Sequence, residues 1–449
     1  MSWLNLGLLL TLVCGHAEVW VTVINRLHAR PISPKLLRRI RHVHDLLIPG
    51  FALAVFVGLG LTGPRLLFGG SWKDIPWGWV PLLMISAAGV AGGLFGIVRY
   101  HLTRRCTLQV GGESCISLIR TPNGSLPVAP GQFERLARLP FNEQATLDLN
   151  RKQFVHPGLP QEFAGLRILH LSDWHFEGTI TRAYFERVAE IAARETVDLV
   201  TFTGDLLDNP SCLEWLPTTL GRFSAPLGCW YILGNHDWYL DADEARRQLN
   251  TLGWKDATAG IHTVPYRGGQ LCIAGDEAPW MGQSPEFPQW STASQSSTPE
   301  FRILLSHTPD NIERARRQGV DLMLSGHNHG GQVILPVVGP VYSPSRTGCR
   351  YAGGAFWRSP TLLHVSRGLS GRHPLRWRCH PEVTVLEFVT PGEVTHGLPV
   401  APPWRHSPLE PDRPRVGTTK GTSGARPIEF DPPEWIGDGK NDVTLVADV

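Results

Sequence analysis

The chain has 449 residues, which leaves room for two or three domains and a large hydrophobic core. Its 42 Lys and Arg residues nearly balance its 40 Asp and Glu residues, so there is no strong basic field and no general reason to expect nucleic-acid binding. Only 18% of the residues are charged and 16 are Trp, a composition that indicates contact with a membrane.

Residues 1–100 contain three apolar stretches that predict a transmembrane helical region. The runs at 46–68 and 77–100 are nearly all apolar and long enough to cross a bilayer. The run at 3–24 is a weaker third span, because a histidine and a glutamate interrupt it. It is not typical of a secretory signal, since no basic segment precedes it and further spans follow.

Charge bias around the spans predicts their orientation. Six Lys or Arg residues lie between the first two spans, one lies in the next loop, and three more follow the third span. The positive-inside rule therefore places the first loop and everything after residue 99 in the cytoplasm. If 3–24 does not cross, the other two spans form a hairpin and the same orientation follows. The predicted location is the cell membrane, with several spans in contact with membrane lipids and a cytoplasmic catalytic domain.

The eight cysteines are irregularly spaced, and no pair has C-x-x-C spacing. A thiolate zinc site is therefore not expected. An even number could also form disulfides, but in a chain of this size the irregular spacing favours free, mostly buried thiols in a reducing compartment.

Three further regions follow the predicted spans. Residues 101–144 are expected to be a connector with some strand character. From 145 to 390, short apolar strands alternate with helices, for example the helices predicted at 181–195 and 309–319, which indicates an α/β layered core. Residues 391–449 are rich in Pro and Gly, and we predict a mostly disordered tail.

Metal-binding types of side chain follow five of the predicted strands. In each case an apolar run comes first, and Asp, Asn or His residues follow its C-terminal end, where the loops of an α/β sheet converge. These residues are Asp173 and His175; Asp205 and Asp208; Asn235, His236 and Asp237; His307; and His327 and His329. Any one of these motifs alone is ordinary turn chemistry or a structural histidine. Their coincidence at five strand ends predicts one common site.

The donors in this set favour particular metals. Carboxylate, imidazole and amide-oxygen ligands without thiolate suit two divalent ions such as Mn, Fe, Zn, Co or Ni. Gly204, Gly234 and Gly326 stand beside the donors, where the lack of a Cβ lets the backbone turn sharply and come close to an ion.

In this order the motifs resemble the calcineurin-like metallophosphoesterase family, whose pattern is D-x-H, G-D-x-x-D, G-N-H-[DE], H and G-H-x-H. Flanking runs such as "GHNHGGQVILPVVGPVYSPS" are similar to its bacterial membrane-associated phosphodiesterase subgroup, although Trp174 and Asn328 stand where that subgroup usually has Leu and Thr. Asn209 replaces the Arg of the Ser/Thr protein phosphatases. The resemblance implies a four-layer α/β/β/α metallophosphoesterase sandwich over 145–390, preceded by the transmembrane region.

The resemblance also implies a role for each residue. One metal would be held by Asp173, His175, Asp205 and His329, and the second by Asp205, Asn235, His307 and His327. His236 would be the catalytic histidine, positioned by Asp208, and Asn235 together with His236 would bind the phosphate. The implied activity is hydrolysis of a phosphodiester or pyrophosphate bond by a hydroxide that bridges the two metals.

Two questions stay open at the level of sequence. The first question is the substrate, for which there are two cases. In the first case the substrate is lipid-linked or a nucleotide sugar, as for the UDP-2,3-diacylglucosamine pyrophosphatases of lipid A synthesis. In the second case it is a soluble phosphodiester, and the spans only localise the hydrolase at the membrane. Trp174, Trp238 and Trp280 are candidates for an apolar approach in the first case. The alternative to an enzyme is a non-catalytic membrane scaffold or binding module on the same fold. Such proteins usually lose ligands, and none of the seven ligand positions is lost here.

Overall fold

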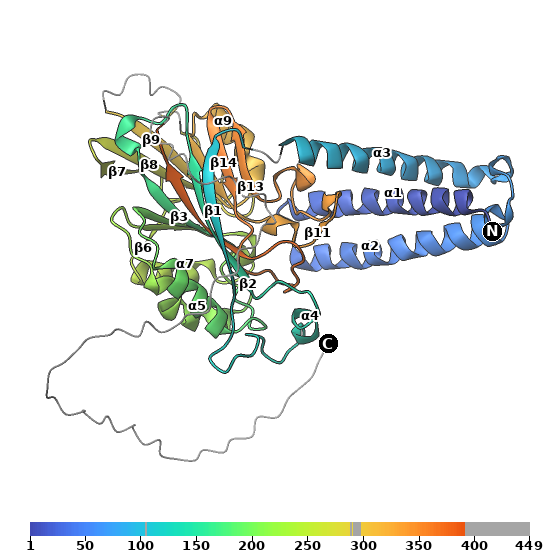
Figure 1. Cartoon of the computed structure of the whole chain (residues 1–449), viewed down its shortest axis with the longest axis horizontal. Coiled ribbons are helices and arrows are strands. Elements are labelled where there is room, and N and C mark those ends of the chain that lie inside the picture. The colour runs from blue at the N-terminus through green and yellow to red at the C-terminus, as the bar shows by residue number, and fades with distance from the viewer. Residues whose placement is uncertain (104–105, 288–289, 291–297, 391–449) are drawn as a thin grey trace, which may run out of the picture. The chain divides into compact units, whose positions relative to one another are not determined.

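The computed structural model describes residues 1–103, 106–287, 290 and 298–390 (Figure 1). The tail predicted over 391–449 lies outside these described residues. Within them the chain forms three long N-terminal helices, followed by two large β-sheets with shorter helices around them.

The N-terminal helices are α1 (Trp3–His28), α2 (Pro34–Val55) and α3 (Val80–Thr103). A π-helix at Phe56–Leu61 continues α2, and a 3₁₀ turn at Trp77–Trp79 leads into α3. Three segments are long and apolar enough to cross a membrane: Trp3–His28, Lys35–Leu61 and Trp77–Thr103.

The second of these segments corrects the span predicted at 46–68. It begins earlier, because the basic residues before the apolar run are good helix formers and continue the same helix. It also ends earlier, at Leu61, because Gly63 takes a positive φ of 41° and Pro64 follows it.

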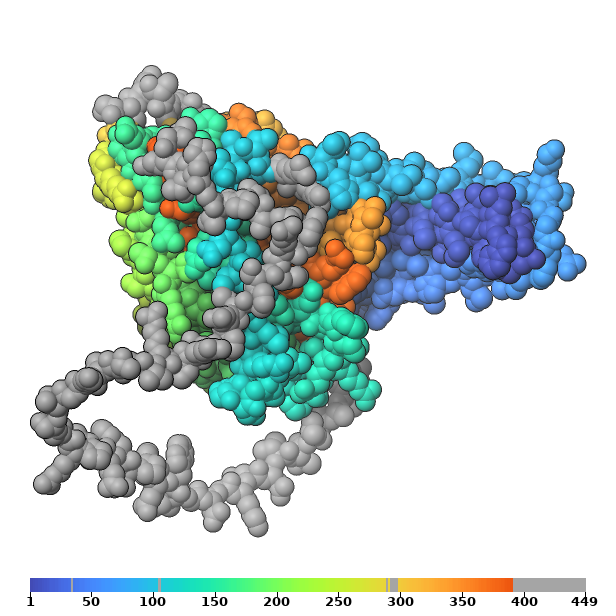
Figure 2. All heavy atoms as spheres, in the orientation of Figure 1, coloured from blue at the N-terminus to red at the C-terminus, as the bar shows by residue number. Residues whose placement is uncertain are grey.

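The N-terminal helices expose large apolar side chains along most of their length (blue in Figure 2). Only 11–22% of the most apolar stretch of each span is buried within the protein, as expected of helices that face lipid. Helices α1 and α3 approach each other most closely at Gly15 and Gly89, where a Cβ on either residue would overlap the backbone of the other helix. Small residues at such crossings let membrane helices pack backbone against backbone.

The first large sheet has seven strands in the order β1-β2-β15-β3-β4-β5-β6. Its strands are β1 (Gln109–Leu118), β2 (Thr146–Phe154), β3 (Arg167–Leu171), β4 (Leu199–Thr203), β5 (Cys229–Ile232), β6 (Trp254–Asp256) and β15 (Glu382–Phe388). β3 to β6 are parallel, and β1 pairs antiparallel with β2 at one edge. The segment predicted as a connector at 101–144 therefore contributes an edge strand to the catalytic domain, because β1 extends the hydrogen-bonded ladder of β2.

The second large sheet has six strands in the order β13-β14-β10-β9-β8-β7. Its strands are β7 (His262–Tyr266), β8 (Gly269–Asp276), β9 (Glu300–Ser306), β10 (Leu322–Ser325), β13 (Gly354–Arg358) and β14 (Thr361–Val365). The four central strands are parallel, and an antiparallel strand closes each edge. A short pair, β11 (Ile334–Leu335) and β12 (Gly339–Pro340), lies outside both sheets.

Short helices cover the two sheets. The α-helices are α4 (Glu134–Ala137), α5 (Arg182–Ala192), α6 (Asn235–Trp238), α7 (Ala242–Thr251) and α9 (Ile312–Arg317). Further 3₁₀ helices lie at Leu66–Phe68, Trp72–Asp74, Gln161–Phe163, Pro210–Thr218, Leu220–Arg222, Pro309–Asn311, His329–Gly331 and Gly348–Tyr351. The helices predicted at 181–195 and 309–319 are confirmed as α5 and as a 3₁₀ turn that runs into α9.

Alternating apolar residues divide the domain into four layers. One core lies between the sheets, a second between the seven-stranded sheet and helices α5 and α7, and a third between the six-stranded sheet and α9 (Figure 1). On β3, for example, Ile168 faces the other sheet while Leu169 faces the helices. The expected α/β/β/α sandwich is confirmed.

All eight cysteines lie among the described residues, and all are free thiols. Cys212, Cys229, Cys272 and Cys379 are buried, and only Cys14, in α1, is exposed. The expectation of free rather than paired cysteines is confirmed.

Candidate metal centre

The five polar strand ends meet at one place, although they come from both sheets. Asp173 and His175 follow β3, Asp205 and Asp208 follow β4, and the Asn235–Asp237 turn follows β5. His307 follows β9, and His327 and His329 follow β10. The centre is therefore built across the open end of the sandwich, where the carboxyl ends of the parallel strands of both sheets face the same side.

One group of four side chains can hold a cation. Asp173, His175, Asp205 and His329 each place one ligand atom within 4.8 Å of the others. His175 Nε2 lies 3.2 Å from His329 Nε2 and 3.4 Å from Asp205 Oδ2. Asp173 Oδ1 is 3.6 Å from His329 Nε2.

A second group shares Asp205 with the first. Asp205, His307 and His327 again bring their ligand atoms within 4.8 Å of one another. His307 Nε2 lies 3.2 Å from Asp205 Oδ2, 3.2 Å from His327 Nδ1 and 3.1 Å from the amide oxygen of Asn235. All seven side chains expected to bind metals thus come together, with Asp205 common to both groups.

Outside hydrogen bonds fix which nitrogen of several imidazoles faces inward. His307 Nδ1 donates to the carbonyl of Thr203 at 2.7 Å, and His329 Nδ1 donates to the carbonyl of Ser370 at 2.8 Å. In its neutral form each ring then presents the lone pair of Nε2 to other lone pairs, since its neighbours are carboxylate oxygens, an amide oxygen and imidazole nitrogens. Burial lowers the pKa of His307, but the Asp205 carboxylate raises it to about 9, so a proton occupies that Nε2 until a cation displaces it. Lone pairs that converge in a buried space repel unless a cation lies between them, so the donor set fits divalent metals.

Asp208 bridges two imidazoles beside the first group. Its Oδ2 lies 3.0 Å from His175 Nδ1, and its Oδ1 accepts a short hydrogen bond from His236 Nδ1. His236 is the more open of the two rings, with 23% of its side chain exposed, whereas His175 is 1% exposed. The Nε2 of His236 is thereby left to act on a ligand. The carboxylate also orients His175, a role that the sequence did not suggest.

The charges of the centre shift its pKa values. Burial opposes the ionisation of Asp205 and Asp208, but the surrounding imidazoles outweigh it and hold the pKa of each carboxyl well below its usual value. Burial lowers the pKa of His236, yet the Asp208 and Asp205 carboxylates raise it to about 10. Before any cation binds, Asp205 and Asp208 are therefore ionised and His236 is protonated, whereas burial raises the pKa of Asp173.

Five of the seven donors stand on strained backbone. Asp173, His175, Asp205, His327 and His329 have φ values between 47° and 69°, in the left-handed region. Such conformations cost roughly 1–3 kcal/mol each and persist only where the surroundings enforce them. Two glycines make room for the turns, since a Cβ at Gly234 would collide with the Asp205 carboxylate and one at Gly326 with that of Asp173.

Two residues support the donors in ways that the sequence did not predict. The Asp237 carboxylate accepts the backbone N–H groups of Leu206, Leu207 and Gly234, so it ties the loop after β4 to the loop after β5. Arg376 is fully buried and donates to the carbonyls of Ser370 and His329. Asp237 is marked by its place in the G-N-H-D motif, whereas no spacing marks Arg376.

The expectation that tryptophans line an approach is wrong for Trp174. Its side chain is fully buried and packs against Phe176, Phe185 and Phe202 under helix α5. Trp174 lies in the loop after β3, and the positive φ of Asp173 and His175 on either side of it leaves its side chain pointing away from the donors and into the core. Trp280 is also buried, with its ring 4.7 Å from that of His327, and it walls the second group of donors.

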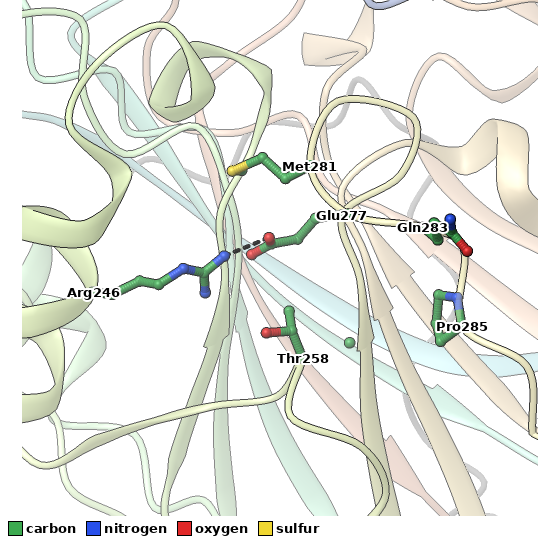
Figure 3. A pocket seen from close by; sticks show the side chains of 8 residues that line it. Arg246, Thr258, Glu277, Met281, Gln283 and Pro285 are labelled. Carbon is green, nitrogen blue, oxygen red and sulfur yellow. Dashed lines mark hydrogen bonds and ion pairs between the residues drawn. The ribbon is translucent and has the colours of Figure 1, made fainter.

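The structure also contains a hollow of about 420 Å³ (Figure 3). Arg246, Glu277 and Met281 are among its lining residues, and the Arg246–Glu277 ion pair crosses it. The other carboxylate oxygen of Glu277 accepts the N–H of Leu233 at 2.7 Å, directly before the Gly234 turn. None of the seven donors lines this hollow, and Glu277 connects its lining to the backbone just before Gly234.

The chain matches the calcineurin-like phosphoesterase family over residues 166–331. It is 34% identical over 234 residues to the metallophosphoesterase YkuE of Bacillus subtilis, an alignment that covers 51% of this chain and 80% of that protein. The chain belongs to the calcineurin-like phosphoesterase family.

Two further members of the family bear names that describe an activity. Phosphodiesterase YaeI of Escherichia coli is 30% identical over 236 residues, which is 50% of this chain and 83% of YaeI. The UDP-2,3-diacylglucosamine pyrophosphatase LpxG of Chlamydia muridarum is 26% identical over 284 residues, which is 51% of this chain and 86% of LpxG. Residues 166–331, which match the family, contain all seven donors of the centre.

Proposed function

We propose that this protein is a membrane-anchored hydrolase of phosphodiester or pyrophosphate bonds that works with two divalent cations. The observation that carries the proposal is the pair of donor groups joined at Asp205, which offers two adjoining cation positions. One position would take Asp173, His175, Asp205 and His329, and the other Asp205, Asn235, His307 and His327. The names of YaeI and LpxG support hydrolysis as the activity.

The residues around the donors have distinct tasks in this proposal. Bound divalent ions such as Mn, Fe, Zn, Co or Ni would acidify water and neutralise phosphoryl oxygens. The side-chain N–H of Asn235 and the ring of His236 bind the phosphoryl group from the open side. His236 Nε2–H donates its proton to the leaving oxygen, while the Asp208 carboxylate on Nδ1 keeps the ring in place.

The simplest test is hydrolysis of bis-p-nitrophenyl phosphate by the purified full-length chain. We expect no turnover after chelation and recovery of activity when Mn²⁺ is returned, because the converging lone pairs bind nothing but a cation. The assay follows release of p-nitrophenolate. Protein that stays folded and inert with Mn²⁺, Zn²⁺, Co²⁺ or Ni²⁺ would favour the alternative of a non-catalytic membrane scaffold or binding module. The intact set of seven donors speaks against that alternative.

Contacts between the N-terminal helices and the catalytic domain support a position of the centre close to the membrane surface. The side chain of Asn25, near the end of α1, accepts the N–H of Ser343 at 3.2 Å. Tyr239, whose ring lies 6.1 Å from that of His236, donates to the carbonyl of Ile32 between α1 and α2. The connection between α1 and α2 therefore lies beside the loop that carries the proposed proton donor.

This connection belongs to the basic segment that the charge bias assigns to the cytoplasm, most of whose basic residues lie in the first part of α2, so we propose a cytoplasmic catalytic domain at the cell membrane. Protease added to intact cells should leave the catalytic domain uncut, because the bilayer shields it. The same protease added to inverted membrane vesicles should cleave it. Immunoblotting of the domain reads out both arms, and cleavage in intact cells would reverse the orientation.

We further propose that the substrate is an amphiphile with its phosphate ester at headgroup depth. The support is the placement of His236 next to the α1–α2 connection, together with the name of LpxG, which describes a pyrophosphatase of an acylated sugar nucleotide. A soluble phosphodiester would need no such placement.

A further inference from the structure

A line of polar side chains interrupts the apolar space between the two sheets. Alternation along the strands turns Lys152 of β2, His170 of β3, Thr203 of β4 and His364 of β14 toward this space, where most other inward residues are apolar. His170, Thr203 and His364 have no solvent exposure at all. Buried polar groups at such positions are normally satisfied by one another.

These side chains form a continuous chain of hydrogen bonds. Lys152 Nζ lies 3.1 Å from His364 Nε2, and His364 Nδ1 lies 2.9 Å from His170 Nδ1. His170 Nε2 lies 2.9 Å from the hydroxyl of Thr203, which donates to the hydroxyl of Ser172 at 2.7 Å. Ser172 in turn is hydrogen-bonded to the carboxylate of Asp173, a proposed metal ligand.

The direction of every bond follows from its first member. An ammonium group can only donate, so Nε2 of His364 accepts and its proton sits on Nδ1. That proton is donated to Nδ1 of His170, whose own proton is then on Nε2 and goes to Thr203. The hydroxyls of Thr203 and Ser172 donate onward in the same direction, and the last acceptor is the Asp173 carboxylate. Each donor therefore points from Lys152 toward the metal centre.

The charges around this chain of hydrogen bonds agree with the direction of donation along it. Burial lowers the pKa of His170 to about 3 and holds that of His364 well below its usual value, so both rings are neutral at pH 7. Lys152 lies 4.0 Å from the Glu382 carboxylate, and Arg367 pairs with both Glu382 and Asp148. Lys152 and Arg367 thus face the carboxylates of Glu382 and Asp148. The positive and negative charges at the start of the hydrogen-bonded chain are therefore equal in number.

We propose that Lys152, His364, His170, Thr203 and Ser172 act as one positioning relay that orients the metal ligand Asp173. The relay also touches the second group of donors, since the backbone carbonyl of Thr203 accepts Nδ1–H of His307. It holds one ligand of each cation position from the inside of the sandwich. The inference rests on the proposed function, because it gives the relay a metal centre to serve.

The relay predicts that a break far from the centre weakens metal binding. Lys152→Met removes the first donor, and Thr203→Val removes the central hydroxyl with little change of shape. Loss of such outer partners typically costs about 10–100-fold in metal affinity, so we expect the dissociation constant for Mn²⁺ to rise by about that factor in each variant. Thr203→Ser keeps the hydroxyl and should stay close to wild type.

The test titrates metal-free, full-length protein in detergent with Mn²⁺ and reads the dissociation constant by calorimetry. Gln153→Met is the matched control, because Gln153 lies on the same strand as Lys152 but bonds to Glu387 outside the relay. If the relay acts as one unit, the double variant Lys152→Met/Thr203→Val should bind Mn²⁺ as tightly as the single variant with the lower affinity. ¹⁵N spectra of labelled histidines add a second readout, with protons expected on Nδ1 of His364 and Nε2 of His170.

The outcomes separate the two proposals. Wild-type protein that neither binds Mn²⁺ nor hydrolyses a phosphodiester contradicts the proposed function. Wild-type protein that does both, with Lys152→Met and Thr203→Val binding Mn²⁺ equally well, overturns the relay. Fully additive losses, or the opposite tautomers in the ¹⁵N spectra, overturn it as well. If Lys152→Met does not fold, the contrast between Thr203→Val and Thr203→Ser decides.

Discussion

Asp205→Asn should abolish phosphodiester hydrolysis and empty both cation positions at once. Its Oδ2 lies 3.4 Å from His175 Nε2 and 3.2 Å from His307 Nε2, and its Oδ1 accepts the N–H of His236. The substitution removes the one charge that both positions share. We expect a fall in kcat/KM of more than about 10³-fold, above the 10²–10³ that a single charge-stabilising donor is worth. Metal analysis of the purified variant should show far less than one bound ion per chain.

Asp241→Asn is the matched control for this prediction. It makes the same chemical change at an exposed helix N-cap, where Asn caps α7 as well as Asp does. Two ions retained at full occupancy by Asp205→Asn would rule out a shared ligand. Membranes that contain Asp205→Asn also test the substrate: incubated with lipid extracts, they should accumulate a phosphate ester that wild-type membranes remove. Accumulation of soluble esters alone would argue against the amphiphile.

His236→Ala should keep both ions and lose most of the turnover. The ring belongs to neither group of four donors. Its Nδ1 donates a hydrogen bond to the Asp208 carboxylate, and 23% of its side chain is exposed. Positioned proton transfer is worth about 10²–10⁴-fold, so kcat should fall by that factor. The loss should be greater for an alkyl ester than for p-nitrophenyl esters, because p-nitrophenolate leaves readily without a proton. Rates on both substrates, with metal content measured on the same samples, check the prediction.

Tyr239→Phe provides the comparison for His236→Ala. It removes a hydroxyl from the same loop that bonds to the α1–α2 connection, and it leaves the ring beside His236 in place. Its rate on bis-p-nitrophenyl phosphate should match that of wild type. An equal loss of activity on both kinds of ester in His236→Ala would assign the ring to phosphate binding alone.

The sequence indicated that the seven donors lie together because they follow strands that are easy to recognise. Runs such as Leu199–Thr203 and Leu322–Ser325 are short, buried and bounded by glycine, so their ends could be placed to within a residue or two. Residues at the carboxyl ends of parallel strands then share one edge. The sequence did not predict that two sheets supply the donors, because nothing in the sequences of β9 and β10 indicates which sheet each strand joins.

Residues that act through tertiary contacts could not be predicted. Trp174 looked like part of an approach because it stands between two expected ligands, yet the left-handed backbone of Asp173 and His175 leaves its side chain in the core. Arg376 and Lys152 come from loops and strands without metal-type motifs, and only the folded chain brings them near the centre. The strand character expected within 101–144 is that of β1, but its place at the edge of the sheet depends on pairing with β2, which its weak apolar pattern does not indicate.

Asp208 touches His175 with one oxygen and His236 with the other. The two rings are therefore coupled by a rigid bridge, and a tilt of the first is passed to the second. The proton donor is aligned only in molecules whose neighbouring imidazole is also in place. In the proposed mechanism, a centre in which His175 is out of place would therefore also lack an aligned His236 and could not protonate the leaving oxygen.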